Sequence, residues 1–455
     1  MRRSMRGWVW TCGVIGALVA AGCGGGVSST TSTSTTGSTT GAGGSSTTST
    51  STTGSTTGAG GAGGSMLGPF TSHGAASYEA QTALAADGKG SAVVAWIGFF
   101  ADGSSSIGYA VSRDAGASWT KPAYVPSPGG RFASSPALAV DGQGRFSLAW
   151  LGFRIDPQKP DEHVYLARLD AATESFGEPV IASDDGSADT RDFDKPSLAV
   201  DANDNLLVTW ADFTGFNTGT PPALTFARSV DGTTFNRTTV TADMSFGNLA
   251  SLCVDASAGP AAPVFLVHLV QGATLLLHRS VDQGKTWQPM AVPVSDVVFQ
   301  DPTCVAHGSN LWIAYAEGMA AFSPSMDSPA DLVRVVHSGN AGVNFDAPAL
   351  VSIGPAGPAR LFPRISRSPS GELQIAYYEG TPNNPANLML ATSSDGNSWT
   401  TNGLAMAGTF TLDRTLASWL GDVLGIAATA SGTLMSYTDN SEGKSHIALA
   451  VPAPK

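Results

Sequence analysis

The chain has 455 residues, of which only 13% are charged, and Gly alone accounts for 54 of them. Its formal net charge of −12 offers no basic surface to a phosphate backbone, so we expect no nucleic-acid partner. The length exceeds that of one ordinary globular domain unless the fold is a barrel or is built from repeats.

The first 22 residues have the features of an export signal. Three arginines near the start precede an apolar stretch, residues 8–21, that is too short to span a membrane. The stretch ends in Ala20-Ala21-Gly22-Cys23, which resembles the lipobox of bacterial lipoproteins, although Ala20 stands where Leu is usual. The resemblance implies cleavage before Cys23 and lipidation of its thiol. The protein would then be extracytoplasmic and lipid-anchored to the cell envelope, at the outer membrane or cell surface. Ordinary secretion is the alternative.

Residues 24–65 contain almost nothing but Gly, Ser, Thr and Ala. With so few apolar side chains to offset chain entropy, they are predicted to form a flexible tether, and about 40 such residues reach roughly 35 Å. The predicted organisation is a lipoprotein signal peptide over 1–22, a lipidated Cys and flexible linker over 23–65, and a folded domain over 66–455.

A strand pair recurs seven times in the folded domain. In each copy an apolar strand leads through a polar turn to a second apolar strand that ends in an aromatic residue or His; the first copy runs from Ala83 to Trp96. Equivalent positions are 87, 141, 201, 255, 306, 368 and 429. The period of about 57 residues is the size of a four-stranded propeller blade.

A second repeat follows the third predicted strand of most units. Full copies of the pattern Ser-x-Asp-x-Gly-x-Ser/Thr-Trp occupy 112–119 and 280–287, shorter copies occupy 229–235 and 393–399, and weaker ones occupy 170–176 and 338–345. The Asp can accept hydrogen bonds from turn N–H groups, the Gly can take a positive φ, and the aromatic side chain can fold back onto the sheet. We therefore assign a structural role to Asp114, Trp119, Asp231, Phe235, Asp282, Trp287, Asp395 and Trp399.

Together the two repeats resemble the Asp-box, or bacterial neuraminidase repeat, propellers of the sialidase-like superfamily over residues 78–455. Residues 193–201 and 419–427 look like motifs of its secreted bacterial members. The resemblance implies an all-β propeller with four-stranded antiparallel blades. Seven copies favour seven blades, and six, the number in sialidases, is the alternative. Because the seventh unit ends after its third strand, we expect residues 66–73 to supply the fourth and close the ring.

Two cysteines remain in the folded domain. Cys253 and Cys304 occupy the same repeat position in units 4 and 5, so they are expected on neighbouring innermost strands. In an oxidising compartment they can form a disulfide, and two buried free thiols are the alternative.

One face of the propeller is expected to carry the site. Alternating strand direction places the loops before strand 1 and after strand 2 of every unit on the same face, and the charged residues of this charge-poor chain gather there. The candidate ligand-binding residues are Arg131, Arg191, Asp301, Arg360, Arg364, Arg414, Trp419 and Asp422.

Sialidase chemistry, as the resemblance implies it, needs three Arg to hold a carboxylate, a Tyr nucleophile activated by Glu, and an Asp acid. The candidates for the catalytic roles are Tyr78, Glu79, Asp192 and Asp194. Their order along the chain does not match the family, and its early Arg-Ile-Pro motif is absent.

No cofactor is assigned from the sequence. A dense acidic loop, residues 184–194, offers oxygen ligands for Ca²⁺, but its spacing fits no EF-hand loop, and a solvated loop is the alternative. The seven His residues show no paired metal-ligand spacing.

Three functions are compatible with these features. The first is a monomeric, surface-anchored propeller that binds a glycan or protein ligand on its charged face. The second is an exo-sialidase or related glycoside hydrolase, and the third is a non-catalytic envelope scaffold.

Overall fold

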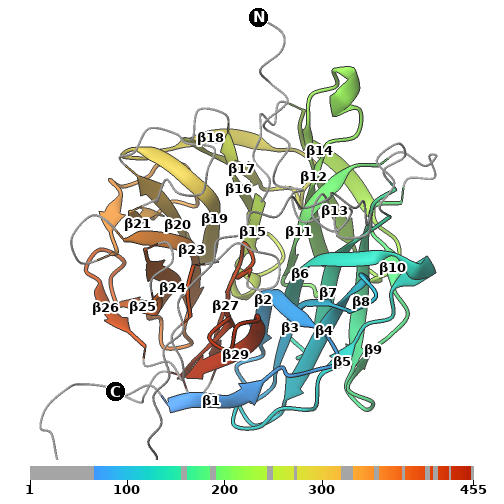
Figure 1. Ribbon diagram of the computed structural model, residues 1–455. Helices are drawn as coiled ribbons and strands as arrows, with labels where there is room; N and C mark the ends of the chain where they lie inside the picture. Colours follow the sequence, from blue (N-terminus) through green and yellow to red (C-terminus); the bar gives the residue numbers. More distant parts are fainter. Residues whose placement is uncertain are drawn as a thin grey trace, which may run out of the picture.

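The computed structural model describes residues 66–154, 161–184, 191–242, 250–270, 274–318, 331–352, 358–381, 385–404, 410–412, 419–429 and 432–451. These residues form seven antiparallel sheets arranged in a ring (Figure 1). The prediction of a seven-bladed propeller is confirmed, and the six-bladed alternative is wrong.

Within each blade the strands follow one another from the inner to the outer edge of the ring. Blade 1 is β2 (Tyr78–Ala86), β3 (Ala92–Phe99), β4 (Ser105–Ser112) and β5 (Ala123–Tyr124). Blade 2 is β6 (Phe132–Val140), β7 (Phe146–Phe153), β8 (His163–Asp170) and β10 (Val180–Ile181), with β9 (Ser175–Phe176) also paired to β8. Blade 3 is β11 (Phe193–Val200), β12 (Leu206–Asp212), β13 (Ala223–Ser229) and β14 (Asn236–Thr241). Blade 4 is β15 (Ala250–Val254), β16 (Val264–Val270), β17 (Thr274–Ser280) and β18 (Gln288–Val292).

The remaining blades follow the same order. Blade 5 is β19 (Val297–His307), β20 (Asn310–Gly318), β21 (Leu332–Ser338) and β22 (Ala349–Leu350). Blade 6 is β23 (Ala359–Arg367), β24 (Leu373–Gly380), β25 (Asn387–Ser393) and β26 (Thr400–Gly403). Blade 7 is β27 (Gly425–Thr429), β28 (Gly432–Asp439), β29 (His446–Val451) and β1 (Met66–Thr71). Short 3-10 turns occur at η1 (Pro128–Gly130), η2 (Phe216–Thr218) and η3 (Ala256–Ala258).

The ring is closed by the start of the described chain. Strand β1 pairs with β29, with Met66 opposite Val451 and Thr71 opposite Ala448. Phe70 is buried with Trp96 of blade 1 and Ile447 of blade 7, so β1 also fills the interface between the first and last blades. The expectation that residues 66–73 supply the missing fourth strand is confirmed.

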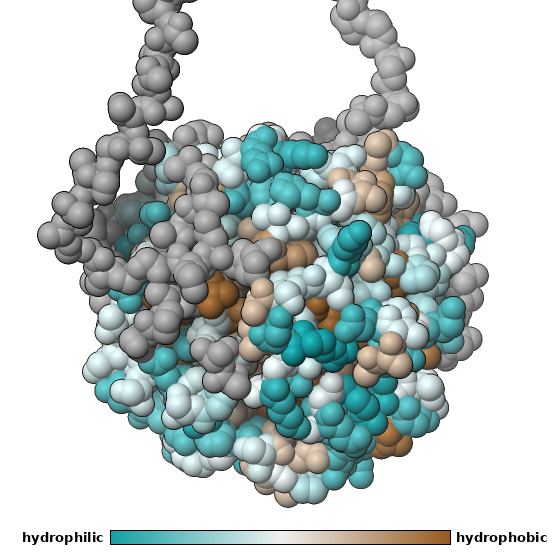
Figure 2. Space-filling model, turned by 90° about the horizontal axis from the view of Figure 1, so that it is seen from below, coloured by the Kyte–Doolittle hydropathy of each residue, from teal (hydrophilic) through white to brown (hydrophobic). Residues whose placement is uncertain are grey.

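The hydrophobic core is divided among the blades. Seven clusters of buried residues each combine side chains from two neighbouring blades, so that one cluster fills each interface around the ring. This division explains why strands 2 and 3 read as continuous apolar runs, since both of their faces are covered. Figure 2 views the molecule from below Figure 1, the side where β1 lies; hydrophilic residues and residues of intermediate hydropathy cover most of the described surface there, and hydrophobic ones are scattered.

The inner strands begin earlier than the sequence predicted, so they extend further toward the face that was expected to carry the site. In five of them a β-bulge interrupts the pairing with strand 2. Four bulges place a non-glycine residue at positive φ: Gln81, Ser135, Lys195 and Phe362. A bulge breaks the alternation of side chains, which is why the strands were predicted to begin after it. Tyr78, Glu79, Asp194 and Arg360 therefore lie within strands rather than in the loops that were expected to precede them.

The loops predicted as Asp-boxes share one hydrogen-bond pattern. Asp282 accepts from the backbone N–H groups of Lys285 and Thr286 at 3.1 and 2.9 Å, and Ser280 Oγ accepts from Gly284 N at 2.8 Å. In the weaker copy at 338–345, Asn340 takes the place of Asp and still accepts from Asn344 N at 2.8 Å.

These loops also join neighbouring blades, which sequence analysis did not anticipate. Trp287 of blade 4 packs edge-on against Phe226 of blade 3, with ring centroids 5.1 Å apart. Trp119 of blade 1 packs against Phe70 of blade 7 at 5.7 Å. A side chain on Gly284 would collide with Phe226, so the glycine is required both for its φ of 87° and for this close approach.

Replacing Trp287 by Ala is expected to lower the free energy of unfolding by about 3 kcal/mol, because a half-buried indole at a blade interface is lost. Urea denaturation measures the change. Val281→Ala in the same loop removes part of a side chain that is 57% exposed and is expected to have no effect. Equal midpoints for Trp287→Ala and wild type would contradict the role of this residue at the interface.

Candidate functional site

Ionisable side chains from blades 2 and 3 lie together on the face opposite the predicted Asp-box loops. They come from the start of β6, the segment before β8, the start of β11 and the end of β12. We refer to them as the polar cluster, which consists of Arg131, Asp161, Glu162, His163, Arg191, Asp192, Asp194 and Asp212.

On one side of this cluster, Asp161 contacts both Arg131 and His163. Its carboxylate accepts from Arg131 Nη2 at 2.7 Å, and its backbone oxygen accepts from Arg131 Nη1 at the same distance. His163 Nε2 lies 3.0 Å from the other carboxylate oxygen. Burial alone would raise the pKa of Asp161, but the hydrogen bond and charge of Arg131, together with the charges of His163 and Arg154, hold the pKa below its ordinary value.

Arg191 is buried beside Asp161. Its backbone pairs with that of Asp161 in an isolated parallel bridge, and its Nη1 donates to the carbonyl oxygen of Ser183 at 3.3 Å. The guanidinium carbon lies 5.8 Å from the centre of the Phe193 ring. The guanidinium is therefore already held by a backbone oxygen and an aromatic face.

Glu162 is a buried carboxyl, 7% exposed, among other acids. Its Oε2 accepts from the backbone N–H of Phe193 at 2.5 Å. Burial raises its pKa well above the ordinary value, and the negative charges of Asp192, Asp194 and Asp161 add to the rise. The pKa of Asp192 is also raised, first by burial and then by Asp212. Two neighbouring carboxyl groups in this cluster thus retain protons more strongly than free ones.

An ion pair crosses the centre of the ring on this face, which we call the mouth of the ring, between blade 3 and the segment that leads into blade 7. Lys195 Nζ lies 3.2 Å from Asp422 Oδ2, although these blades are not neighbours in the ring. The segment that carries Asp422 runs beside β2, because Thr82 N donates to Val423 O at 3.3 Å. Trp419 packs against the hydrophobic cluster between blades 1 and 2.

The predicted Tyr78 and Glu79 do not form a pair. Tyr78 stacks on Phe99 at 4.7 Å, and burial raises its pKa. The carboxylate of Glu79, 2% exposed, instead bonds Ser72 Oγ, Trp96 Nε1 and Tyr124 Oη. Successive residues of a strand point to opposite faces, so Glu79 is turned toward the ring closure and away from the Tyr78 hydroxyl.

The predicted arginines are divided among separate blades. Arg360 of blade 6, 1% exposed, donates to Glu379 Oε2 at 2.7 Å and to the carbonyl oxygen of Asp331, directly before β21. Arg364 lies opposite Ala376 in blade 6. Arg414, the side chain of Asp301 and most of the acidic loop proposed for Ca²⁺ lie outside the described residues.

The structure thus brings together Arg131, Arg191, Asp192 and Asp194, but not Arg360. Sequence analysis missed Asp161, Glu162 and His163. The available signal was their run of three ionisable residues at the start of a strand, in a chain where only 13% of residues are charged.

A second buried polar group lies in blade 4, where His268 and His278 face each other with their Nε2 atoms 3.1 Å apart. Burial, and then the charge of His268, lowers the pKa of His278 to about 4, against about 6.5 for an unfolded histidine. The folded state keeps this ring neutral, whereas the unfolded chain takes up a proton on it below about pH 6.5. The free energy of unfolding therefore decreases as the pH falls from about 6.5 toward 4.

Between pH 7.5 and pH 4 we expect this pair to reduce the free energy of unfolding by about 3 kcal/mol. His278→Gln cannot gain a proton and should lose less stability over the same range. Urea denaturation of both proteins at the two pH values measures the difference, and parallel pH profiles would contradict the assignment.

Within the part of the chain that the structure describes, no helix is long and apolar enough to cross a membrane.

Comparison with known proteins gives similarity in structure only, since no family model and no curated protein matches the chain. A protein of unknown function from Dyadobacter fermentans is 15% identical with a TM-score of 0.48, over 83% of this chain and 95% of its own. The Hadza microbial sialidase Hz136 is 12% identical with a TM-score of 0.49, over 83% of this chain and 66% of its own. The intramolecular trans-sialidase from Ruminococcus gnavus is 14% identical with a TM-score of 0.44, over 85% of this chain and 96% of its own. These three similarities are in structure, at 12–15% sequence identity.

Proposed function

We propose that the protein binds a glycan or protein ligand at the mouth of the ring, on the face that carries the polar cluster. The observation that supports this is the concentration of charge. In a chain with few ionisable residues, eight of them form the polar cluster, and Lys195 with Asp422 extends it across the mouth. Interlocked groups of this kind present a fixed set of donors and acceptors to a ligand.

A glycan suits this surface chemically. Sugar hydroxyl groups both donate and accept hydrogen bonds, and carboxyl groups such as Asp192 can do the same when protonated. Tyr78 and Trp419, both half-buried beside the mouth, offer aromatic surface to the apolar face of a sugar ring.

Sialoside hydrolysis is the less favoured alternative, because the arginines it would need are engaged. Arg131 is paired with Asp161, and Arg360 with Glu379 of its own blade. A guanidinium already neutralised in this way must break an ion pair before it can hold a substrate carboxylate. Tyr78 also lacks Glu79 as an activating base.

Binding is tested on glycan arrays and on cell-envelope extracts with the purified chain. We expect Trp419→Ala and Asp422→Asn to weaken the signal at least tenfold. Arg367→Ala is the matched control. Arg367 lines an open groove on the opposite face, together with His307, Trp312 and Glu372. Loss of binding in the control alone would move the ligand to that groove. The absence of any ligand would favour the non-catalytic scaffold.

Hydrolysis is tested separately with a fluorogenic sialoside. We expect no turnover. Turnover that Tyr78→Phe abolishes, while Arg367→Ala retains it, would replace the binding proposal with a glycoside hydrolase.

We further propose that Cys23 is lipidated and that the preceding 22 residues are removed, which would attach the propeller to the cell envelope through the Gly/Ser/Thr-rich tether. Support comes from the sequence alone, since these residues lie outside the described ones. Mass spectrometry of the membrane fraction should find an acylated N-terminal Cys23. Cys23→Ala should release the protein into the soluble fraction, and an unmodified Cys23 in membrane-bound protein would exclude the anchor.

A further inference from the structure

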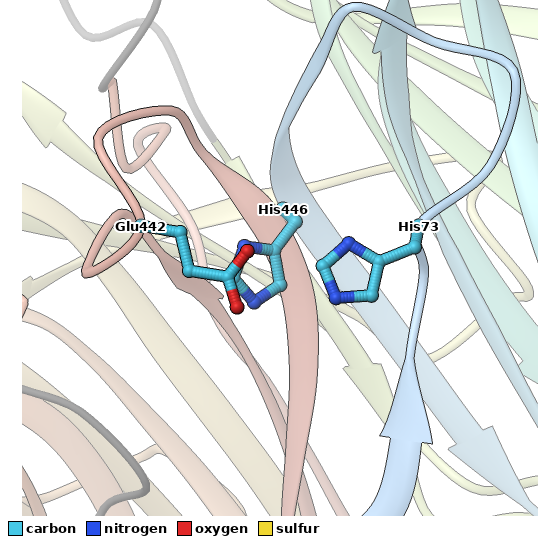
Figure 3. Close-up of side chains that lie close together, drawn as sticks. All are labelled: His73, Glu442 and His446. Carbon is cyan, nitrogen blue, oxygen red and sulfur yellow. The ribbon is translucent and has the colours of Figure 1, made fainter.

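Two histidines and a glutamate from opposite ends of the folded chain meet at the ring closure (Figure 3). His73 lies in the loop that follows β1, Glu442 in the turn between β28 and β29, and His446 at the start of β29. One ligand atom from each residue lies within 4.8 Å of the other two. None of the three belongs to the proposed ligand-binding site.

Hydrogen bonds next to these residues hold the two histidines in place. Ser72 N donates to Ile447 O at 2.9 Å, and Ile447 N donates to Ser72 Oγ at 2.7 Å. Glu79 N donates to Ser445 O at 2.9 Å. The immediate chain neighbours of His73 and His446 are thus fixed to each other, so little chain entropy would be lost on binding a ligand between them.

The ring geometry fits two imidazole ligands of one ion. The His73 and His446 rings have centroids 4.8 Å apart and an interplanar angle of 29°. A nitrogen about 2 Å from Zn²⁺ places the centre of its ring about 3 Å from the ion, so a tetrahedral angle separates two ring centres by about 5 Å. The observed separation requires only a small adjustment.

His446 supplies a second, independent indication. It is 6% exposed, and its Nδ1 is buried without a hydrogen-bond partner among the described residues. A buried ring nitrogen without a partner is costly, and an ion bound to this imidazole would offset part of that cost. His73 and Glu442 are exposed, which leaves a path for an ion from solvent.

We propose that His73, Glu442 and His446 bind a zinc-class divalent cation that clips the first described strand to the C-terminal hairpin of blade 7. Two imidazoles and one carboxylate are a ligand set that Zn²⁺ accepts, with water in the fourth position, whereas Mg²⁺ prefers oxygen ligands alone. The site bridges segments joined by no disulfide, so the binding free energy of the ion adds to the stability of the closed ring.

The test uses the full chain without a polyhistidine tag, stripped of metal with a chelator. Calorimetric titration with ZnCl₂ should give one site per chain, and thermal unfolding should shift to higher temperature with ZnCl₂ but not with MgCl₂. Co²⁺ should give the visible absorption of a four- or five-coordinate ion. Because His73 and Glu442 are exposed, His73→Ala and Glu442→Gln should fold normally.

His73→Ala is expected to weaken zinc affinity by about 100-fold or more and to abolish the cobalt spectrum, and Glu442→Gln should weaken affinity by a smaller factor. His307→Ala, which removes an exposed histidine on the opposite face, is the control and should leave both unchanged. Zinc affinity and thermal shift that survive in His73→Ala, or the absence of binding by wild type at micromolar ZnCl₂, would overturn the proposal.

Discussion

Removing the Cys253–Cys304 disulfide is expected to lower the free energy of unfolding by about 4 kcal/mol. The bond closes a loop with a sequence separation of 51 residues, and constraint of such a loop in the unfolded chain gives this magnitude. It joins the inner strands β15 and β19 of blades 4 and 5. Of the two alternatives left by the sequence, the structure has the disulfide rather than two buried thiols.

Urea denaturation of the wild type with and without a reductant measures this loss. The double variant Cys253→Ala, Cys304→Ala should unfold at the same low urea concentration whether or not reductant is present. If the double variant does not respond to the reductant, the loss of stability in the wild type comes from the broken disulfide and not from a general effect of the reductant. A wild type that unfolds at one midpoint in both conditions would show that the disulfide is absent in solution.

Replacing Trp96 by Ala is expected to lower the free energy of unfolding by about 3–5 kcal/mol, at least as much as the loss expected for the half-buried Trp287. Trp96 is fully buried in the cluster where blade 1 meets the closing blade, and its Nε1 donates to Glu79 at 2.8 Å. The substitution leaves a cavity at the ring closure and also removes a donor from a buried carboxylate.

The contribution of the hydrogen bond can be separated from that of packing. Trp96→Phe keeps most of the apolar contact but loses the donor, so we expect a cost of about 2 kcal/mol. Trp210, which is 2% exposed, is the matched control in blade 3, since it is nearly as buried as Trp96 but its Nε1 has no hydrogen-bond partner among the described residues. Trp210→Phe should therefore cost less than Trp96→Phe, and the reverse order in thermal or urea unfolding would contradict the role given to Glu79.

The number of blades and the closing strand could be predicted because both depend on a repeat that is visible in the chain. The apolar run from Ala83 and its six relatives fixed the count, and the missing strand after Val451 required a donor from the N-terminal side. What the repeat did not reveal was the bulge. At Gln81 and Lys195 an extra residue at positive φ shifts the alternation of side chains between the two faces of the strand. Neither Gln nor Lys is a residue type that favours positive φ, so the sequence does not reveal the bulge.

For the candidate site, the sequence predicted which face of the propeller carries it but not the contacts between its residues. Arg131 and Arg191 do lie near each other, because Asp161 contacts both. The partners of these arginines and the direction of Glu79 depend on three-dimensional contacts between blades, which no local pattern encodes. The same reason hid His73 and His446 as a pair, since they are among the most distant residues of the folded domain in sequence and meet only when the ring closes.

The position of β1 has a mechanical consequence. Any load applied to the chain ahead of Met66 enters the fold through this outermost strand, which is held to β29 alone on that sheet edge. A load on the preceding chain acts at Met66, the first residue of β1, whereas His73 follows the other end of the strand. The load would therefore separate the strand from Met66 toward the histidines. Under tension β1 would separate from β29 first, while β2 of blade 1 stays in contact with β27 and β28 of blade 7 and the other six sheets keep their own strands.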